Sequence, residues 1–284
     1  MYHAKKLGKG QHMTFDKAMH ASAIDRLELE HALEQALHKG EFRVYYQPIV
    51  SLKTGRVTSL EALVRWDHPE RGLVSPAEFI PVAEETGLII PLGLWVLRKA
   101  CREGLELQGQ FLRGGPFSIS VNLSGKQFSQ KDLSGQIDKI LRETGYDARM
   151  LTLEITESVV MEDADSAIDI LGELKRLNIQ LAIDDFGTGY SSLSYLHSFP
   201  IDSLKVDRSF VGKMSIDRRN LEIVRTIIAL SHNLGIRVTA EGIETSDQLA
   251  QLRALQCEYG QGYLFSKPLD NGGIKEWIKL DPRW

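Results

Sequence analysis

Short runs of β-branched and other apolar residues alternate with longer segments of helical pattern along most of the chain. After Gly40, runs typical of strands occur at residues 43–49, 58–64, 118–123, 151–156, 180–184, 203–207, 237–241 and 262–265. Strands that alternate with helices form parallel sheets, and eight of them within roughly 245 residues favour closure into a (β/α)8 barrel of the TIM type. Only the turn SLKTG joins the first two runs, so the first strand is expected to run antiparallel. A doubly wound open sheet is the alternative.

Capping signals predict where several helices begin and end. Ser75 stands before a proline, and Glu78 completes the pattern of a capping box. The helix that starts there is expected to end at Gly87. Further helices are expected at residues 92–106, 131–144, 166–177, 220–234 and 245–255, with Gly145 and Gly235 as stops.

The first forty residues differ from the rest of the chain. Residues 1–22 begin with a short, basic, glycine-punctuated stretch that is too small to bury a core by itself. Residues 23–40 are rich in helix formers, and one face is approximated by Ile24, Leu27, His31, Leu33 and Leu37. This helix either packs on the domain that follows or links that domain to another one upstream.

Composition narrows the class of protein. Hydrophobic residues make up 43% and charged residues 25%, as in ordinary globular proteins. A net charge of −4 argues against a partner that is a nucleic-acid polymer. Cys101 and Cys257 are expected to be buried thiols in a reducing compartment. The chain has no apolar run long enough for a membrane span and no secretory signal, so it is expected in the cytoplasm, although the full-length protein could be tethered to a membrane.

Acids, amides and one lysine gather at the C-terminal ends of the expected strands. In a barrel these ends meet at one mouth, which is where barrel active sites are built. The residues concerned are Glu61, Asn122, Glu154, Asp184, Asp185, Lys205, Asp207, Glu241 and Gln261.

Carboxylates crowded in one mouth require compensating cations. Each like-charged pair a few Å apart costs on the order of 4 kcal/mol at an effective dielectric near 20. Two divalent ions together with Lys205 would balance the five carboxylates Glu61, Glu154, Asp184, Asp185 and Glu241. Oxygen donors without histidine or cysteine favour Mg²⁺ or Mn²⁺, and paired metals suit the attack of water on phosphorus. A single acid at a strand end is usually a helix cap or a surface ion-pair partner, so the prediction depends on the whole set.

At this point the residues resemble a known family. Glu61-Ala62-Leu63, followed by Arg65 and Trp66, is similar to the EALxRW signature of cyclic di-GMP phosphodiesterases. Other similar segments between about residues 42 and 269 are YYQPIV, SPAEFIPVAEETG, SVNLS, LEITES, DDFGTGYSSL, LKVDRSFV, AEGIE and QGYLFSKP. The resemblance implies a barrel with an antiparallel first strand and hydrolysis of cyclic di-GMP to linear 5′-pGpG. The alternatives are a non-catalytic cyclic di-GMP receptor and an unrelated barrel enzyme such as a metal-dependent aldolase.

The resemblance also implies two metal ions in each active site. The first is expected on Glu61, Asn122, Glu154 and Asp184, and the second on Asp184, Asp185 and Glu241. Lys205 is expected to bind and orient the metal-activated water, and Glu241 is the other candidate for assisting its deprotonation.

Residues around the metals receive roles from the same resemblance. Substrate contacts are expected from Gln47, Arg65 and the backbone near Leu63, with Gln261 beside the water. Supporting acids are Glu157, Asp207 and Glu244. Glu157 is expected to anchor the loop that contains Gly187, Thr188 and Gly189.

The opening segment MYHAKKLGKGQHMTFD resembles the end of a GGDEF diguanylate cyclase domain. The resemblance implies three parts: a remnant of that upstream domain at 1–22, a linker helix at 23–40 and an EAL phosphodiesterase domain at 41–284. The implied partners are an upstream GGDEF or sensory domain and a second copy of the chain in a homodimer.

Overall fold

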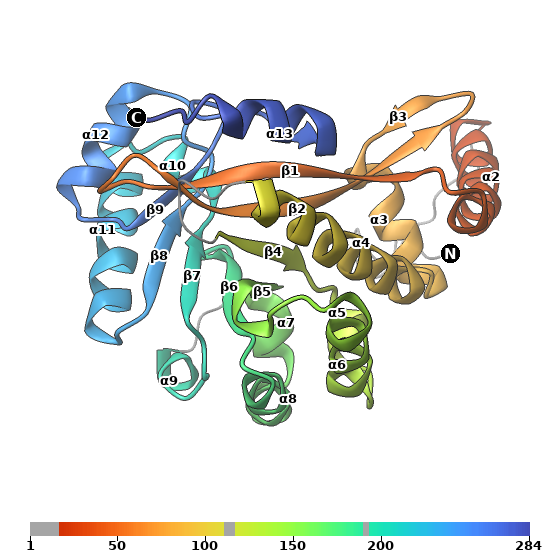
Figure 1. Cartoon of the computed structure of the whole chain (residues 1–284), viewed down its shortest axis with the longest axis horizontal. Coiled ribbons are helices and arrows are strands. Elements are labelled where there is room, and N and C mark those ends of the chain that lie inside the picture. Colours follow the sequence, from red (N-terminus) through yellow and green to blue (C-terminus); the bar gives the residue numbers. More distant parts are fainter. Residues whose placement is uncertain (1–16, 111–116, 190–192) are drawn as a thin grey trace.

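A closed eight-stranded barrel forms the centre of the molecule. The computed structural model describes residues 17–110, 117–189 and 193–284. Its barrel strands are β1 (Phe42–Ser51), β2 (Val57–His68), β4 (Ser118–Asn122), β5 (Leu151–Thr156), β6 (Gln180–Phe186), β7 (Ser203–Val206), β8 (Arg237–Ala240) and β9 (Tyr259–Gln261). They pair in the order β1-β9-β8-β7-β6-β5-β4-β2, and β2 closes the barrel on β1. Strand β1 is antiparallel to both neighbours while the other pairs are parallel, which confirms the predicted fold (Figure 1).

Helices surround the barrel and two short strands extend it. The longer helices are α3 (Pro76–Thr86), α4 (Ile89–Gln110), α6 (Leu133–Thr144), α8 (Ala164–Arg176), α11 (Arg218–Asn233), α12 (Ser246–Ala254) and α13 (Asn271–Lys279). Shorter elements are β3 (Gly72–Val74), α5 (Gly125–Phe128), η1 (Ala148–Met150), α7 (Glu157–Glu162), α9 (Leu193–Leu196), α10 (Arg208–Val211) and β10 (Leu269–Asp270).

The predicted helix ends agree well with the structure. Ser75 caps α3, but its hydroxyl accepts from the amide of Ala77 at 3.3 Å. The amide of Glu78 donates instead to the Ser75 carbonyl oxygen at 2.9 Å, so the expected capping box is not formed. Gly87 ends α3 with φ 83°, and Gly145 ends α6 with φ 72°. Both are left-handed conformations that glycine adopts without steric cost.

The N-terminal helix α2 (Lys17–Lys39) packs on α3, and Leu33 and Leu37 of the predicted face contact the core, while His31 does not belong to the buried side. Leu29, Leu33 and Ala36 are buried there, whereas His31 is exposed. Positions i, i+4 and i+7 fall on one side of a helix, and His31 lies off that side. Residues 1–16 of the predicted GGDEF remnant lie outside the described residues. The rest of the remnant, residues 17–22, forms the beginning of α2.

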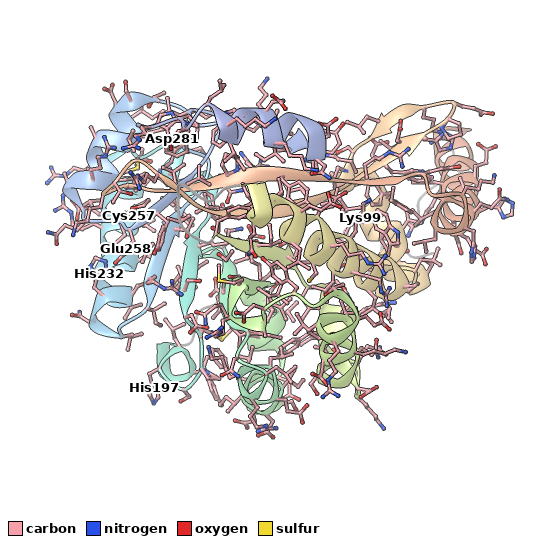
Figure 2. The ribbon with its side chains drawn as sticks, viewed as in Figure 1. Lys99, His197, His232, Cys257, Glu258 and Asp281 are labelled. Carbon is pink, nitrogen blue, oxygen red and sulfur yellow. The ribbon has the colours of Figure 1, made fainter. Side chains whose placement is uncertain are left out.

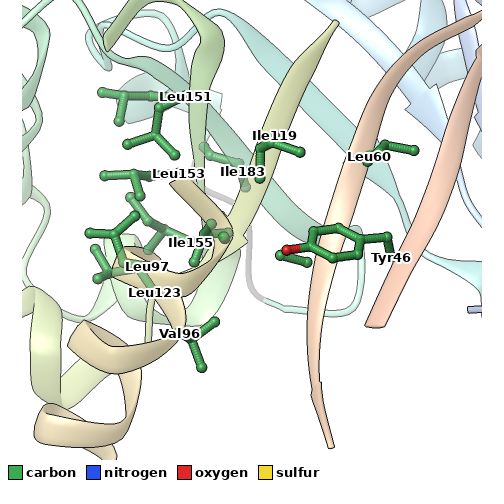
Figure 3. Close-up of a cluster of buried hydrophobic side chains, with 14 of the residues drawn as sticks. Tyr46, Leu60, Val96, Leu97, Ile119, Leu123, Leu151, Leu153, Ile155 and Ile183 are labelled. Carbon is green, nitrogen blue, oxygen red and sulfur yellow. The ribbon is translucent and has the colours of Figure 1, made fainter. Parts of the chain in front are cut away.

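The hydrophobic core lies between the strands and the helices. Alternate residues of a strand point to opposite faces, so Ile119 and Val121 of β4 are buried in the core while Ser120 faces the barrel interior. On strand β5, Leu153 belongs to the hydrophobic cluster shown in Figure 3, and the next residue, Glu154, faces the barrel interior. The barrel interior is consequently polar and can accommodate polar and charged side chains.

The position of the last barrel strand was predicted wrongly. Residues 262–265 form a turn, and β9 lies just before them. The cause is a close approach of two backbones, because a Cβ on Gly262 would collide with the backbone of Ile243. In its place Ile243 donates its amide to the Gln261 carbonyl and accepts from the Leu264 amide, both at 3.0 Å.

Polar contacts on the outside of the barrel tie two helices to it. On α4, Lys99 contacts Glu103 at 3.0 Å, and Glu103 accepts from the hydroxyl of Tyr46 at 2.7 Å. On α11, His232 contacts Glu258 at 3.0 Å, on the opposite side of the molecule from Lys99 (Figure 2). Both cysteines are buried and free, as predicted. In the described part of the chain, no helix has the length and apolar character needed to cross a bilayer.

Candidate metal centre at the barrel mouth

Lys205 of β7 lies at the centre of the site and is 2% exposed. Its ammonium nitrogen is 2.6 Å from a Glu241 oxygen, 2.7 Å from Glu154, 3.3 Å from Asp184 and 3.6 Å from Glu61. These carboxylates come from β2, β5, β6 and the end of β8, so the barrel brings together residues that are far apart in the sequence. One ammonium therefore faces four carboxylates.

Two amide side chains hold Glu61 from either side. Asn122 donates to Glu61 Oε1 at 2.7 Å, and Gln261 donates to Glu61 Oε2 at 2.5 Å. The same Gln261 amide lies 3.1 Å from the Gln47 side-chain oxygen. The Gln261 oxygen is buried and has no partner in the described part of the chain. Since Asn122 uses its side-chain nitrogen on Glu61, its side-chain oxygen remains available as an acceptor.

A bulge in β6 brings two consecutive aspartates to the mouth. The pairing of β6 with β7 shifts register between Ile183 and Phe186. Asp185 adopts a left-handed φ of 54°, and its amide donates to Asp184 Oδ1 at 2.9 Å. Without the bulge, consecutive side chains would point to opposite faces of the strand. Three carboxylate oxygens therefore lie within 4.8 Å of one another, one each from Asp184, Asp185 and Glu241.

The pKa of Glu61 and the pKa of Glu154 shift in opposite directions although both residues are buried beside Lys205. Burial raises the pKa of Glu154 well above its ordinary value, Lys205 opposes this, and Glu61 and Asp184 reinforce it. Burial also acts to raise the pKa of Glu61, but Lys205 and the bonds from Gln261 and Asn122 outweigh it and lower that pKa. The two amide donors to Glu61 and the like charges beside Glu154 together favour this difference.

The other groups of the cluster are also perturbed. Burial, opposed by Lys205 and reinforced by Asp184 and Glu61, raises the pKa of Glu241 to about 8. Burial and the carboxylates Asp184 and Asp207 raise the pKa of Asp185 to about 6. Burial alone would lower the pKa of Lys205, but the surrounding carboxylates hold it well above its ordinary value. The cluster thus has an excess of negative charge over its single lysine.

A cavity of about 350 Å³ opens above this cluster. Its lining includes the predicted residues Gln47, Glu61, Leu63, Asp184, Asp185, Asp207, Glu241, Glu244 and Gln261. It also includes Arg208, Gly242 and Tyr263, which the sequence reasoning missed. Arg208 and Gly242 directly follow a predicted site residue, and Tyr263 lies two positions after one. This proximity in the sequence is the signal that could have identified them.

Arg65 lies beside the mouth cavity and is absent from its lining. It lines a neighbouring groove of about 310 Å³, which shares Leu63 with the mouth cavity and also contains Asn122. The Arg65 guanidinium donates to the Val64 carbonyl oxygen at 2.8 Å and stands 5.7 Å from the centre of the Tyr45 ring.

Two acids next to the acidic cluster, Glu157 and Asp207, accept hydrogen bonds from backbone amides of neighbouring segments. Buried Glu157 accepts from the amide of Gly187 at 2.9 Å, and its carboxyl carbon would lie 3.4 Å from a Cβ on Gly189. The Thr188 hydroxyl donates to the Asp185 carbonyl oxygen at 2.8 Å. Asp207 caps α10 by accepting from the Ser209 amide at 2.9 Å. The remaining acid of the predicted set, at position 244, is exposed at the rim.

The fold and the site define a barrel protein with an acidic cluster of oxygen donors at its C-terminal mouth. The chain belongs to the EAL domain family, whose model matches residues 30–268.

The relatives of this chain are considerably longer than it is. Protein y4lL of Sinorhizobium fredii is 49% identical over 267 residues, 94% of this chain and 31% of that protein. Cyclic di-GMP phosphodiesterase NbdA of Pseudomonas aeruginosa is 41% identical over 280 residues, 98% of this chain and 35% of NbdA. MucR of the same organism, a bifunctional diguanylate cyclase/cyclic di-GMP phosphodiesterase, is 41% identical over 271 residues, 95% of this chain and 39% of MucR. The chain therefore spans about a third of the length of these curated relatives.

The solved structure of the MucR phosphodiesterase in complex with c-di-GMP has the same fold. Its TM-score is 0.83 at 40% sequence identity, and the match covers 87% of this chain and 99% of that one.

Proposed function

We propose that this chain hydrolyses cyclic di-GMP to linear 5′-pGpG, with divalent cations held at the barrel mouth. The observation that carries the proposal is the cluster of Glu61, Glu154, Asp184 and Glu241 around the single cation Lys205. The names of NbdA and MucR, and the c-di-GMP in the MucR structure, support the choice of substrate.

The residues present fit two hard divalent cations. The donor set consists of carboxylate and amide oxygens, the ligands that Mg²⁺ and Mn²⁺ prefer. With Asp185, the cluster contains five carboxylates and one ammonium, which leaves four negative charges when all are ionised, the charge that two divalent cations neutralise. We assign Glu61, Asn122, Glu154 and Asp184 to one cation, and Asp184, Asp185 and Glu241 to the other.

Bound cations would supply Lewis-acid charge, which makes water acidic enough to attack phosphorus near neutral pH and stabilises the developing negative charge. The protein residues orient the reactants around that charge. Lys205 can direct an N–H toward the attacking water, because its nitrogen lies among the proposed ligands. Glu241 can accept the proton of that water, and the Gln261 amide can fix its orientation.

The mouth and the groove beside it are proposed to hold the nucleotide. Gln47 and Leu63 line the mouth cavity, and Arg65 lines the groove that shares Leu63 with it. A guanidinium at that boundary is suited to a phosphate or to the face of a base.

The full-length protein is proposed to carry a GGDEF or sensory domain before this one. The support is the length of MucR, whose name includes diguanylate cyclase and of which this chain covers 39%. Helix α2, which packs on α3, would be the connection. A cytoplasmic location and a homodimer stay predictions.

Chromatography of the reaction products tests the proposed activity. Purified protein is incubated with cyclic di-GMP in Mg²⁺, Mn²⁺, Ca²⁺ or EDTA, and the nucleotides are separated. We expect pGpG with Mg²⁺ or Mn²⁺ and unchanged substrate with Ca²⁺ or EDTA, because Ca²⁺ takes a larger and looser shell. Tight binding of cyclic di-GMP without turnover in any metal would identify a receptor module instead.

A further inference from the structure

The interior of the barrel beneath Lys205 is a polar cavity of about 130 Å³, to which all eight barrel strands contribute. Barrel interiors are usually filled by layers of Val, Ile and Leu. Here the lining below the acidic cluster consists largely of small hydroxyl side chains, among them Ser118, Ser120, Thr152, Ser203 and Thr239. We call this space the floor channel.

The floor channel reaches the acidic cluster from below. On β7, Ser203 lies two positions before Lys205, and on β5, Thr152 lies two positions before Glu154, so each pair points to the same interior. Lys205 and Glu154 both line the floor channel. They also contact each other at 2.7 Å, and Lys205 contacts Glu241, which lines the mouth cavity. Lys205 and Glu154 of the floor channel are therefore joined by direct contact to Glu241 of the mouth cavity.

The lower part of the floor channel is open to solvent and its walls have free hydrogen-bonding capacity. Ser203 and Thr152 are partly exposed, whereas Ser120 and Thr239, nearer the cluster, are 3% and 6% exposed. None of these hydroxyls makes a hydrogen bond within the described part of the chain. A polar space of 130 Å³ has room for about four waters at roughly 30 Å³ each.

We propose that the floor channel is a hydrated path that brings water to the Lys205–Glu154 pair from the face of the barrel opposite the substrate. The inference rests on the proposed function. Cleavage of one phosphodiester P–O bond consumes one water, whose oxygen forms the new P–O bond while its two protons pass to the leaving 3′-oxygen and to solvent. A bound dinucleotide covers the mouth, so a second entrance lets the next water arrive beneath it.

Filling the floor channel tests this path. Ser203→Leu places a large apolar side chain at the lower end, while Ser203→Ala leaves the path open at the same position. We expect kcat to fall at least about tenfold in Ser203→Leu and to stay within about twofold in Ser203→Ala, with KM and Mn²⁺ affinity unchanged in both. A merely structural disturbance would alter Mn²⁺ affinity as well. Unchanged kcat in Ser203→Leu, with its side chain seen in the channel, would overturn the proposal.

A second measurement applies whether or not the chain is active. A high-resolution crystal structure of the wild-type protein should show ordered waters bonded to the hydroxyls of Thr152, Ser120 and Thr239, forming a chain up to Lys205. A channel closed by side chains or free of water density would overturn the proposal, even in an active enzyme. Inactive wild-type protein with a hydrated channel would instead refute the proposed function.

Discussion

Asp184 and Asp185 are neighbours in the sequence, yet both carboxylates reach the same oxygen cluster beside Glu241. The left-handed φ of 54° at Asp185 makes this possible. A non-glycine residue in that conformation costs roughly 1–2 kcal/mol, and aspartate and asparagine tolerate it best. The backbone of β6 is therefore strained at the point where the proposed cations would bridge two strands.

We expect Asp185→Asn to keep the fold and lose metal affinity. Asparagine adopts the same backbone conformation, and removal of one charge relieves its repulsion with Asp184. The Tm of the metal-free variant should equal or exceed that of the wild type, while Mn²⁺ affinity should fall by about tenfold or more. Calorimetric titration with Mn²⁺ and thermal unfolding in EDTA measure both. Wild-type Mn²⁺ affinity would remove Asp185 from the proposed ligand set.

Lys205→Met should separate catalysis from substrate binding. The variant keeps a side chain of similar length but loses the charge beside Glu154 and Glu241. We expect kcat to fall at least about 100-fold with little change in the affinity for cyclic di-GMP. Because buried carboxylates lose their counter-ion, the metal-free variant should also have a lower Tm, which Mn²⁺ restores. Glu61→Ala is the matched comparison, since loss of a proposed ligand should weaken Mn²⁺ binding directly. Equal loss of nucleotide affinity in both variants would contradict the division of roles.

Metal binding should release protons near neutral pH. In the metal-free protein the pKa of Glu241 is about 8 and that of Asp185 about 6, so Glu241 is mostly protonated at pH 7. A cation must displace that proton, and its apparent affinity should rise as the pH increases from 6 to 8. Calorimetry in two buffers with different ionisation enthalpies measures the released protons. The Glu241→Gln variant should release fewer, and no release from the wild type would mean that Glu241 is already ionised.

The metal-free protein should lose stability over the same range of pH. Burial raises the pKa of Glu154, Glu241 and Asp185, so the folded state binds more protons than the unfolded state from about pH 4.5 upward. Stability consequently falls as the pH rises toward 8. The raised pKa of Lys205 does not change how the free energy of unfolding depends on pH in this range. Lysine is charged in both the folded and the unfolded state below its ordinary pKa. Thermal unfolding in EDTA at pH 5 and pH 8 checks the sign, and a higher Tm at pH 8 would contradict it.

Glu157 should control the catalytic rate through the loop that follows Asp185. Its carboxylate accepts from the Gly187 amide at 2.9 Å, so Glu157→Ala removes an acceptor that fixes the loop next to the proposed second cation. We expect kcat to fall about ten- to a hundredfold at low Mg²⁺ and to recover partly at high Mg²⁺. Glu157→Gln keeps an acceptor oxygen and should retain more activity, and Glu162→Ala, on the exposed side of α7, is the surface control. Wild-type rates for Glu157→Ala at low Mg²⁺ would leave Glu157 with a structural role alone.

The fold could be predicted from the sequence because the interior and exterior of the barrel follow separate rules. Apolar residues on the outer face of each strand gave the strand pattern, and the turn SLKTG gave the antiparallel first strand. The last strand was misplaced because YGQ carries little strand signal, and its position depends on the contact between Gly262 and the backbone of Ile243.

The acidic cluster could be predicted in outline, whereas its detailed geometry could not. Strand ends carrying oxygen donors indicate one mouth once a barrel is assumed. The left-handed backbone at Asp185 has no sequence signal beyond the tolerance of aspartate for it. Arg208, the first residue of α10, and Tyr263, in the turn after β9, reach the mouth cavity from outside the strands, where strand periodicity does not apply.

We expect the mouth to hold two divalent cations around Asp184. Anomalous diffraction at the manganese edge, from crystals grown with Mn²⁺, locates such cations. Two peaks are expected, one among Glu61, Asn122, Glu154 and Asp184, and one among Asp184, Asp185 and Glu241. No anomalous peak at the mouth, or one bound only to residues outside these two sets, would contradict this expectation.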